Sequence, residues 1–154
     1  MSKNIHARVK HLIRKYETRN PLKLAKYLNI HAVHKEYSLH TKGYYIKTLR
    51  NKFIVVNSAL DEHSQRIVLA HELGHAILHS CEPIYFIREY TLFPVGPYER
   101  EANKFAAELL IDDNDIKEMR YKATSYIAAA LEVNEELVKY KIINRQGGHM
   151  YEVP

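Results

Sequence analysis

The sequence predicts an α+β domain that is mostly helical and carries a small three-stranded, mostly antiparallel sheet. Apolar residues recur at helical spacing in three long segments, 3–18, 59–79 and 98–111. Residues 31–57 are instead rich in aromatic and β-branched residues, which favour strands. The chain has 154 residues, of which 46% are hydrophobic and 27% charged, so 1–154 fits a single globular domain.

The N-terminal part is expected to form two helices followed by the sheet. Residues 3–18 predict an amphipathic helix whose apolar side packs on the core. Asn20 and Pro21 predict the start of a short second helix that ends at Leu28, because asparagine caps helices and proline suits their first position. A tight turn is expected at Arg50-Asn51, between the last two of three strands: 32–37, 43–49 and 52–57.

The longest helix is expected over residues 59–79, because Ser58 and Asp61 form an S-x-x-D capping pattern. The irregular stretch that follows contains three prolines. Helical spacing then returns, and the C-terminal helices at 112–145 are expected to pack on the domain. The remaining segments, in order, are the irregular stretch 81–98, a helix at 98–111, helices at 116–122, 124–131 and 134–143, and a loose tail at 146–154.

Composition limits the classes of function. The formal net charge of +5 permits contact with nucleic acid or an acidic partner but does not require it. The single Cys81 excludes an internal disulfide and favours a reducing compartment. Since we find neither a secretory signal pattern nor an apolar run of about 20 residues, we expect a cytoplasmic protein without membrane contact. The oligomeric state is not predicted.

The chemistry of the sequence is concentrated in the pattern H-E-x-x-H, at His71, Glu72 and His75. Residues four apart lie one above the other on a helix, so both histidine rings can bind one metal ion. Glu72 is rotated from His71 by about 100° and can reach a water on that ion as a general base. This is the arrangement of zincin metallopeptidases. The alternative is an ordinary amphipathic helix with two half-buried histidines.

A catalytic zinc site needs a third protein ligand, and the helix at 98–111 offers two candidates. At about 100° per residue, Glu99 lies on the apolar face, where a carboxylate is unusual unless it is paired or binds a metal. Glu101 and Glu108 lie on the polar side, where solvent exposure is expected. Glu99 is therefore the preferred ligand and Glu101 the alternative. Asn103, on the Glu99 face, could hydrogen-bond the other ring nitrogen of a ligand histidine.

His79 is a weaker candidate for the third ligand. It follows His75 by four residues on the same predicted helix. In the metzincin pattern the third histidine instead follows the second by six residues, with a glycine between them. We therefore expect His79 to be a pocket or helix-end residue.

The segments HELGHAILH and EREANKFAAELLI resemble the ImmA/IrrE metallopeptidases, which are gluzincin-like. The resemblance covers most of the chain, from Pro21 to Leu110. It implies that the zinc-ligand glutamate is Glu99, although an assignment shifted to Glu101 stays open. The proline that usually follows the motif is replaced by Ile111-Asp112. The family motif E-x-x-A-N-x-F-A-x-x-L-L is matched at seven positions: Glu99, Ala102, Asn103, Phe105, Ala106, Leu109 and Leu110.

The resemblance also implies a fold, an activity and a partner. Such proteins have a zincin fold with a small sheet beside the H-E-x-x-H helix. ImmA-like members are small cytoplasmic proteases of prophages and conjugative elements, and they cleave a helix-turn-helix repressor. IrrE-like members carry additional domains, so this 154-residue chain is similar to the short form. We therefore expect an endopeptidase with one Zn²⁺ per chain that cleaves such a repressor and derepresses a prophage or mobile element.

The expected mechanism gives each group a role. Zn²⁺ held by His71, His75 and Glu99 lowers the pKa of its bound water, and Glu72 takes the proton as the water attacks the peptide carbonyl. Glu72 then passes the proton to the leaving amine. The second donor to the oxyanion stays open among four residues: Tyr85, Tyr90, His79 and His149.

The sequence is also compatible with two other functions. A binding module could hold a structural or vestigial zinc and sequester a repressor without cutting it, but such a protein has no chemical need for Glu72. Residues 124–143 also predict two short helices about a three-residue turn, loosely similar to a DNA-binding helix-turn-helix. Glu135 and Glu136, at the start of the second helix, would oppose phosphate. Core packing or substrate docking is therefore preferred for this segment, and direct DNA binding is not expected.

Overall fold

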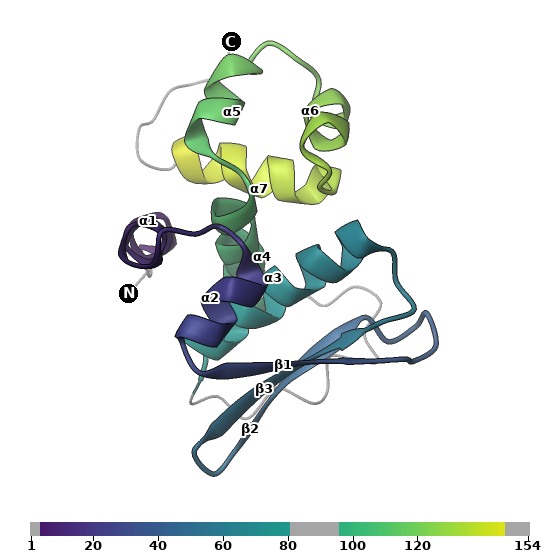
Figure 1. Cartoon of the computed structure of the whole chain (residues 1–154). Coiled ribbons are helices and arrows are strands. Elements are labelled where there is room, and N and C mark those ends of the chain that lie inside the picture. The colour runs from purple at the N-terminus through teal and green to yellow at the C-terminus, as the bar shows by residue number, and fades with distance from the viewer. Residues whose placement is uncertain (1–3, 81–95, 147–154) are drawn as a thin grey trace.

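The computed structural model of the chain describes residues 4–80 and 96–146. These ranges contain seven helices and three strands in the order α1, α2, β1, β2, β3, α3, α4, α5, α6 and α7. Figure 1 shows the sheet at one end of the molecule, α5, α6 and α7 at the other end, and α3 and α4 between them. The expected α+β class, mostly helical with a small sheet beside the motif helix, is confirmed.

The first two helices begin at asparagine caps. The Asn4 side chain accepts a hydrogen bond from the backbone N–H of Ala7 at 3.0 Å, and α1 spans Ile5–Tyr16. The Asn20 side chain likewise caps α2, Pro21–Tyr27, so this predicted start is confirmed. The predicted helix over 3–18 is shorter at both ends, since Glu17 adopts a left-handed conformation that ends α1.

The sheet contains β1 (Ile30–Lys35), β2 (Gly43–Thr48) and β3 (Asn51–Asn57) in the order β1-β3-β2. Strand β2 is antiparallel to β3, whereas β1 is parallel to it. The sheet is therefore mixed, and the expectation of a mostly antiparallel sheet is wrong for β1. The hairpin turn also lies one residue earlier than expected, at Leu49 and Arg50, because Thr48 pairs with Asn51.

A buried asparagine explains the parallel strand. The chain leaves β1 and enters β2 at the same end of the sheet, so residues 36–42 pass the end of β3. Asn57, the last residue of β3, accepts a hydrogen bond from the N–H of Tyr37 and donates to the carbonyl oxygens of Ser38 and Thr41. Its fully buried amide therefore holds this connection in place of a hairpin between β1 and β2.

The motif helix α3 spans Glu62–Leu78 and packs on the sheet. Its cap is Asp61, whose carboxylate accepts from the N–H of Ser64 at 2.8 Å. The helix therefore starts three residues later than the S-x-x-D pattern predicts, with the aspartate rather than Ser58 as the cap. Leu69 and Leu73 on its buried face belong to the main hydrophobic core.

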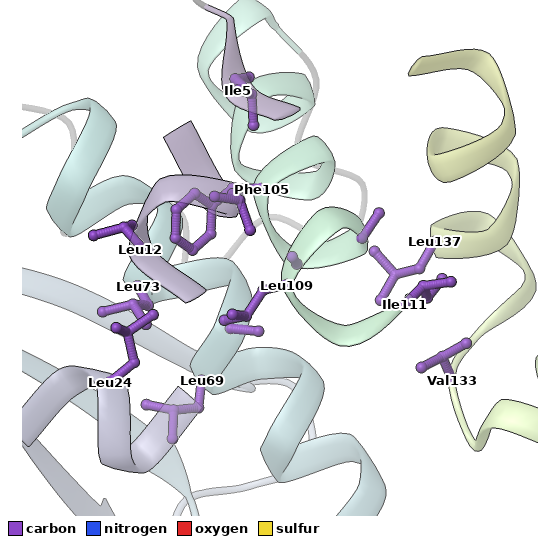
Figure 2. Close-up of a cluster of buried hydrophobic side chains, with 14 of the residues drawn as sticks. Ile5, Leu12, Leu24, Leu69, Leu73, Phe105, Leu109, Ile111, Val133 and Leu137 are labelled. Atoms are coloured by element: carbon purple, nitrogen blue, oxygen red, sulfur yellow. The ribbon is translucent and has the colours of Figure 1, made fainter. Parts of the chain in front are cut away.

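Helix α4 (Pro97–Leu110) joins the sheet half of the molecule to the C-terminal helices α5 (Asp113–Glu118), α6 (Thr124–Leu131) and α7 (Glu135–Gln146). Figure 2 shows core side chains of both halves, among them Leu73, Phe105 and Leu137, in one close-up, and they belong to one buried cluster. Helix α7 packs on α4. The assignment of 1–154 to one domain with helices 112–145 packed on it stays a prediction. Of the tail expected at 146–154, Gln146 is the last residue of α7 and 147–154 lie outside the described residues.

None of the helices in the described residues is both long and apolar enough to cross a membrane.

Candidate metal centre

Two histidines of α3 and one glutamate of α4 meet at a single point. The Nε2 atom of His71 lies 2.9 Å from Oε2 of Glu99, and the Nε2 atom of His75 lies 3.2 Å from Oε1 of the same carboxylate. The two Nε2 atoms are 3.2 Å apart. His75 and Glu99 are buried and His71 is partly buried. These three residues could therefore hold a metal ion between them.

The donor set fits zinc in type and in spacing. Zinc binds histidine nitrogen and carboxylate oxygen at about 2.0–2.2 Å, which places two ligands of a tetrahedral ion about 3.3–3.6 Å apart. The contacts among the His71, His75 and Glu99 donor atoms, at 2.9–3.2 Å, are only slightly shorter. Small side-chain movements would open the cluster to that spacing. The three residues also match the two-histidine, one-glutamate set of catalytic zinc sites.

Gly74 explains how α4 comes close enough to deliver its carboxylate. A Cβ atom at this position would lie 3.0 Å from Cβ of Phe105 and 3.2 Å from the backbone of Ala102. The backbone of α4 therefore crosses α3 directly above the glycine, between the two histidines. Glu99 lies about one helical turn before Ala102, so this close approach sets the carboxylate beside the imidazole rings.

Asn103 contacts the other nitrogen of the His71 ring. Its Oδ1 atom lies 2.8 Å from Nδ1 of His71. An amide oxygen can only accept, so Nδ1 of His71 donates to it, which leaves Nε2 as the ring nitrogen that could bind a metal ion. The contact expected from the sequence is therefore present, and its service to a metal ion stays a proposal.

A second set of contacts on His75 was not expected. Nδ1 of His75 lies 2.9 Å from Nδ1 of His79, and Nε2 of His79 lies 3.1 Å from Oε2 of Glu101. His79 is the C-cap residue of α3 and is buried. The structure thus brings Glu99 into the cluster and Glu101 against His79. Only the four-residue spacing from His75 to His79 signalled this arrangement in the sequence.

The surroundings of Glu99 keep it ionised. Burial raises the pKa of the Glu99 carboxyl, but hydrogen bonds and charge interactions with His71 and His75 outweigh that effect and hold the pKa well below its ordinary value. An ionised carboxylate between two imidazole nitrogens is prepared to bind a cation.

The structure describes only some of the other residues that the sequence singled out. Glu72 follows His71 on α3 and is 5% exposed. Tyr85, Tyr90 and His149 lie outside the described residues, so their suggested oxyanion role stays a prediction. Glu108 is buried against Lys141 and His6, so the expectation that it faces solvent is wrong. The periodicity of α4 alone could not show that α1 and α7 cover this side.

A motif helix with two histidines beside a small sheet, and a glutamate supplied by the next helix, defines the zincin-like metallopeptidase class. The chain belongs to the Peptidase_M78 family, described as the IrrE N-terminal-like domain, whose sequence profile matches residues 25–142. The resemblance to ImmA/IrrE proteins that the motifs indicated is thereby confirmed.

The chain is also similar to a protein of Bacillus phage phi105 named "Uncharacterized immunity region protein 2". The two sequences are 45% identical over 124 residues, which are 79% of this chain and 76% of the phage protein. The similarity thus extends through most of both proteins.

Proposed function

We propose that this protein is a zinc-dependent endopeptidase that cleaves a helix-turn-helix repressor at a specific site and so derepresses a prophage or mobile element. The observation that carries the proposal is the convergence of His71, His75 and Glu99, whose donor atoms lie within 4.8 Å of one another. Membership of a metallopeptidase family supports the same kind of activity.

The proposed mechanism assigns His71, His75 and Glu99 to hold one zinc ion per chain. A zinc ion there would supply Lewis acidity, which makes a water more acidic and stabilises negative charge on the substrate carbonyl. Glu72 would act as the general base that takes the proton from the attacking water and delivers it to the leaving amine. Asn103 would keep the His71 ring in the orientation that points Nε2 at the ion.

The proposed substrate class rests on the family and on the phage relative. That relative is named as an immunity region protein, which supports a partner connected with prophage repression. A repressor that acts on the genome is met in the cytoplasm, so we place the activity there. Lys141 of α7 does not support direct DNA binding, because it is 1% exposed and its Nζ atom is paired with Glu108 and Asp113.

The test is whether the purified, zinc-loaded chain cleaves a helix-turn-helix repressor of the prophage or mobile element proposed to carry it. We expect one cut with the wild type. We expect a loss of at least about 100-fold in rate with Glu72→Gln, because removal of a general base costs roughly 10²–10⁴-fold. The Glu72→Gln variant should still bind one zinc ion, since Glu72 is not among the proposed ligands.

Two results would contradict parts of this proposal. A Glu72→Gln variant that cleaves at the wild-type rate would exclude Glu72 as the base. A repressor that the wild type inactivates but leaves intact would show that the protein is a binding module rather than a protease.

A further inference from the structure

We infer that Glu101 and His79 are positioning residues that hold the His75 ring in the one tautomer able to bind metal through Nε2. This inference rests on the zinc site proposed above. The three residues form a chain of hydrogen bonds from α4 to the metal cluster, which we name the Glu101–His79–His75 relay. Its two links measure 3.1 Å and 2.9 Å.

The direction of each hydrogen bond follows from the carboxylate at the end of the relay. An ionised carboxylate only accepts, so Nε2 of His79 donates to Glu101. A neutral imidazole that carries its proton on Nε2 has a lone pair on Nδ1. Nδ1 of His79 therefore accepts, and Nδ1 of His75 must donate to it.

The consequence reaches the metal-facing nitrogen of His75. With its proton on Nδ1, the neutral His75 ring has its lone pair on Nε2, the atom 3.2 Å from Glu99 and 3.2 Å from Nε2 of His71. Metal ions bind imidazole through such a lone pair. A carboxylate therefore sets the tautomer of His75 through an intervening imidazole, as partners of ligand histidines commonly do directly.

The two histidines of the relay are buried, which keeps water from replacing their hydrogen bonds. The side chains of His75 and His79 are each 1% exposed, so bulk water is not available to replace either partner. The ring of Tyr98 packs edge-on against His79 with ring centroids 4.7 Å apart. Glu101 is 27% exposed and forms the solvent-facing end. The ring of His79 is thus confined on several sides, which limits its freedom to rotate away from His75.

The two ligand histidines are held in different ways by the same helix. Asn103 of α4 reaches His71 directly, at 2.8 Å. Glu101, also of α4, reaches His75 through the intervening ring of His79. Glu99 thus contacts the Nε2 atoms of both ligand histidines. Asn103 contacts the Nδ1 atom of His71, and Glu101 acts on the Nδ1 atom of His75 through His79. The relay gives His79 and Glu101 a role that requires neither to touch the ion.

The test compares two substitutions at position 79 that have the same branched shape but differ in polarity. Asparagine places Oδ1 where histidine has Nδ1, so His79→Asn keeps an acceptor for His75. Leucine fills the space but offers no acceptor. We expect His79→Leu to weaken zinc binding about 10–100-fold and His79→Asn to stay within about threefold of wild type. Zinc affinity of the full chain is measured by competition with a chromophoric chelator, and circular dichroism establishes that each variant is folded.

A second pair of substitutions tests the hydrogen bond between His79 and Glu101 at the partly exposed Glu101. Glu101→Gln keeps an acceptor oxygen, whereas Glu101→Met has the same length and none. We expect the methionine variant to bind zinc several-fold more weakly than the glutamine variant. Because Glu101 is partly exposed, this pair keeps the inference testable if His79→Leu does not fold.

The outcomes separate the relay from the proposed zinc site. Weak binding by His79→Leu together with near-normal binding by His79→Asn would support the relay. Equal affinity in wild type and His79→Leu would overturn it, and so would equal weakening by leucine and asparagine, since that pattern marks a packing role. Wild-type protein that binds no zinc would overturn the proposed function and the relay together.

Discussion

Two glutamates two residues apart on α4 have different surroundings, and the difference predicts their contributions to metal binding. Glu99 contacts the Nε2 atoms of both histidines, whereas Glu101 contacts His79. We expect Glu99→Ala to lower the zinc affinity by more than the roughly 10–100-fold that is typical when a hydrogen-bond partner of a ligand is removed. Glu101→Ala should still bind one zinc per chain, with lower affinity. Metal analysis after dialysis checks this, and zinc retained by Glu99→Ala would assign the third ligand elsewhere.

At the scale of residues, the sequence predicted the three clustered residues better than it predicted the side chains that contact them. The four-residue spacing of His71 and His75 placed both rings on one face, and the apolar surroundings of Glu99 marked it as an unusual carboxylate. The same reasoning could not place Glu101, because its partner His79 comes from another helix. A helical wheel describes which side of one helix a residue lies on, but not which element covers that side.

Gly74 determines how closely α3 and α4 pack, and its replacement tests that contact. Alanine usually stabilises a helix by about 1 kcal/mol relative to glycine. Here the added Cβ would meet Cβ of Phe105 at 3.0 Å and the backbone of Ala102 at 3.2 Å. Neither neighbour can rotate away, so overpacking of about 1–3 kcal/mol should exceed the gain. We expect Gly74→Ala to lower the free energy of unfolding and to weaken zinc binding, because the helices must separate near Glu99.

Urea unfolding and zinc titration measure both effects of Gly74→Ala. An alanine variant more stable than the wild type would show that the helices have room to adjust.

The helices and strands themselves were largely predictable from the sequence, because capping residues and periodicity are local signals. The order β1-β3-β2 was not, since the alternation of a strand specifies its buried face but not its neighbours. That order depends on Asn57 contacts with residues 37–41, which no local pattern reports.

A partly buried group of charges joins α1 and α4 to the C-terminal helices α5 and α7. Nζ of Lys141 on α7 lies 2.6 Å from Oε2 of Glu108 on α4 and 2.6 Å from Oδ1 of Asp113 on α5. His6 on α1 adds a 2.7 Å contact with Glu108. Four helices therefore share one ionic cluster. His6, Glu108 and Asp113 are close enough to bind a metal ion, but the ammonium group of Lys141 already serves as the cation between the two carboxylates.

The ionic cluster predicts how stability changes with acid. Burial raises the pKa of Asp113, but Lys141, His6 and Lys10 outweigh it and lower the pKa from 3.8 to about 2, with Glu108 as the neighbouring carboxylate. Because the folded pKa lies below the unfolded one, the stabilisation is fully present above pH 4 and is lost as the pH falls from about 4 to 2. Asp113 is 28% exposed, so solvent reduces its contribution to the free energy of unfolding to about 1–2 kcal/mol.

The substitution Asp113→Asn removes the titrating group and tests this dependence. In urea unfolding at a series of pH values, the stability difference from wild type should therefore be largest near pH 6 and shrink below pH 4. A difference that stays constant over this range would mean that the Asp113 carboxylate is not stabilised by its cationic neighbours in the folded protein.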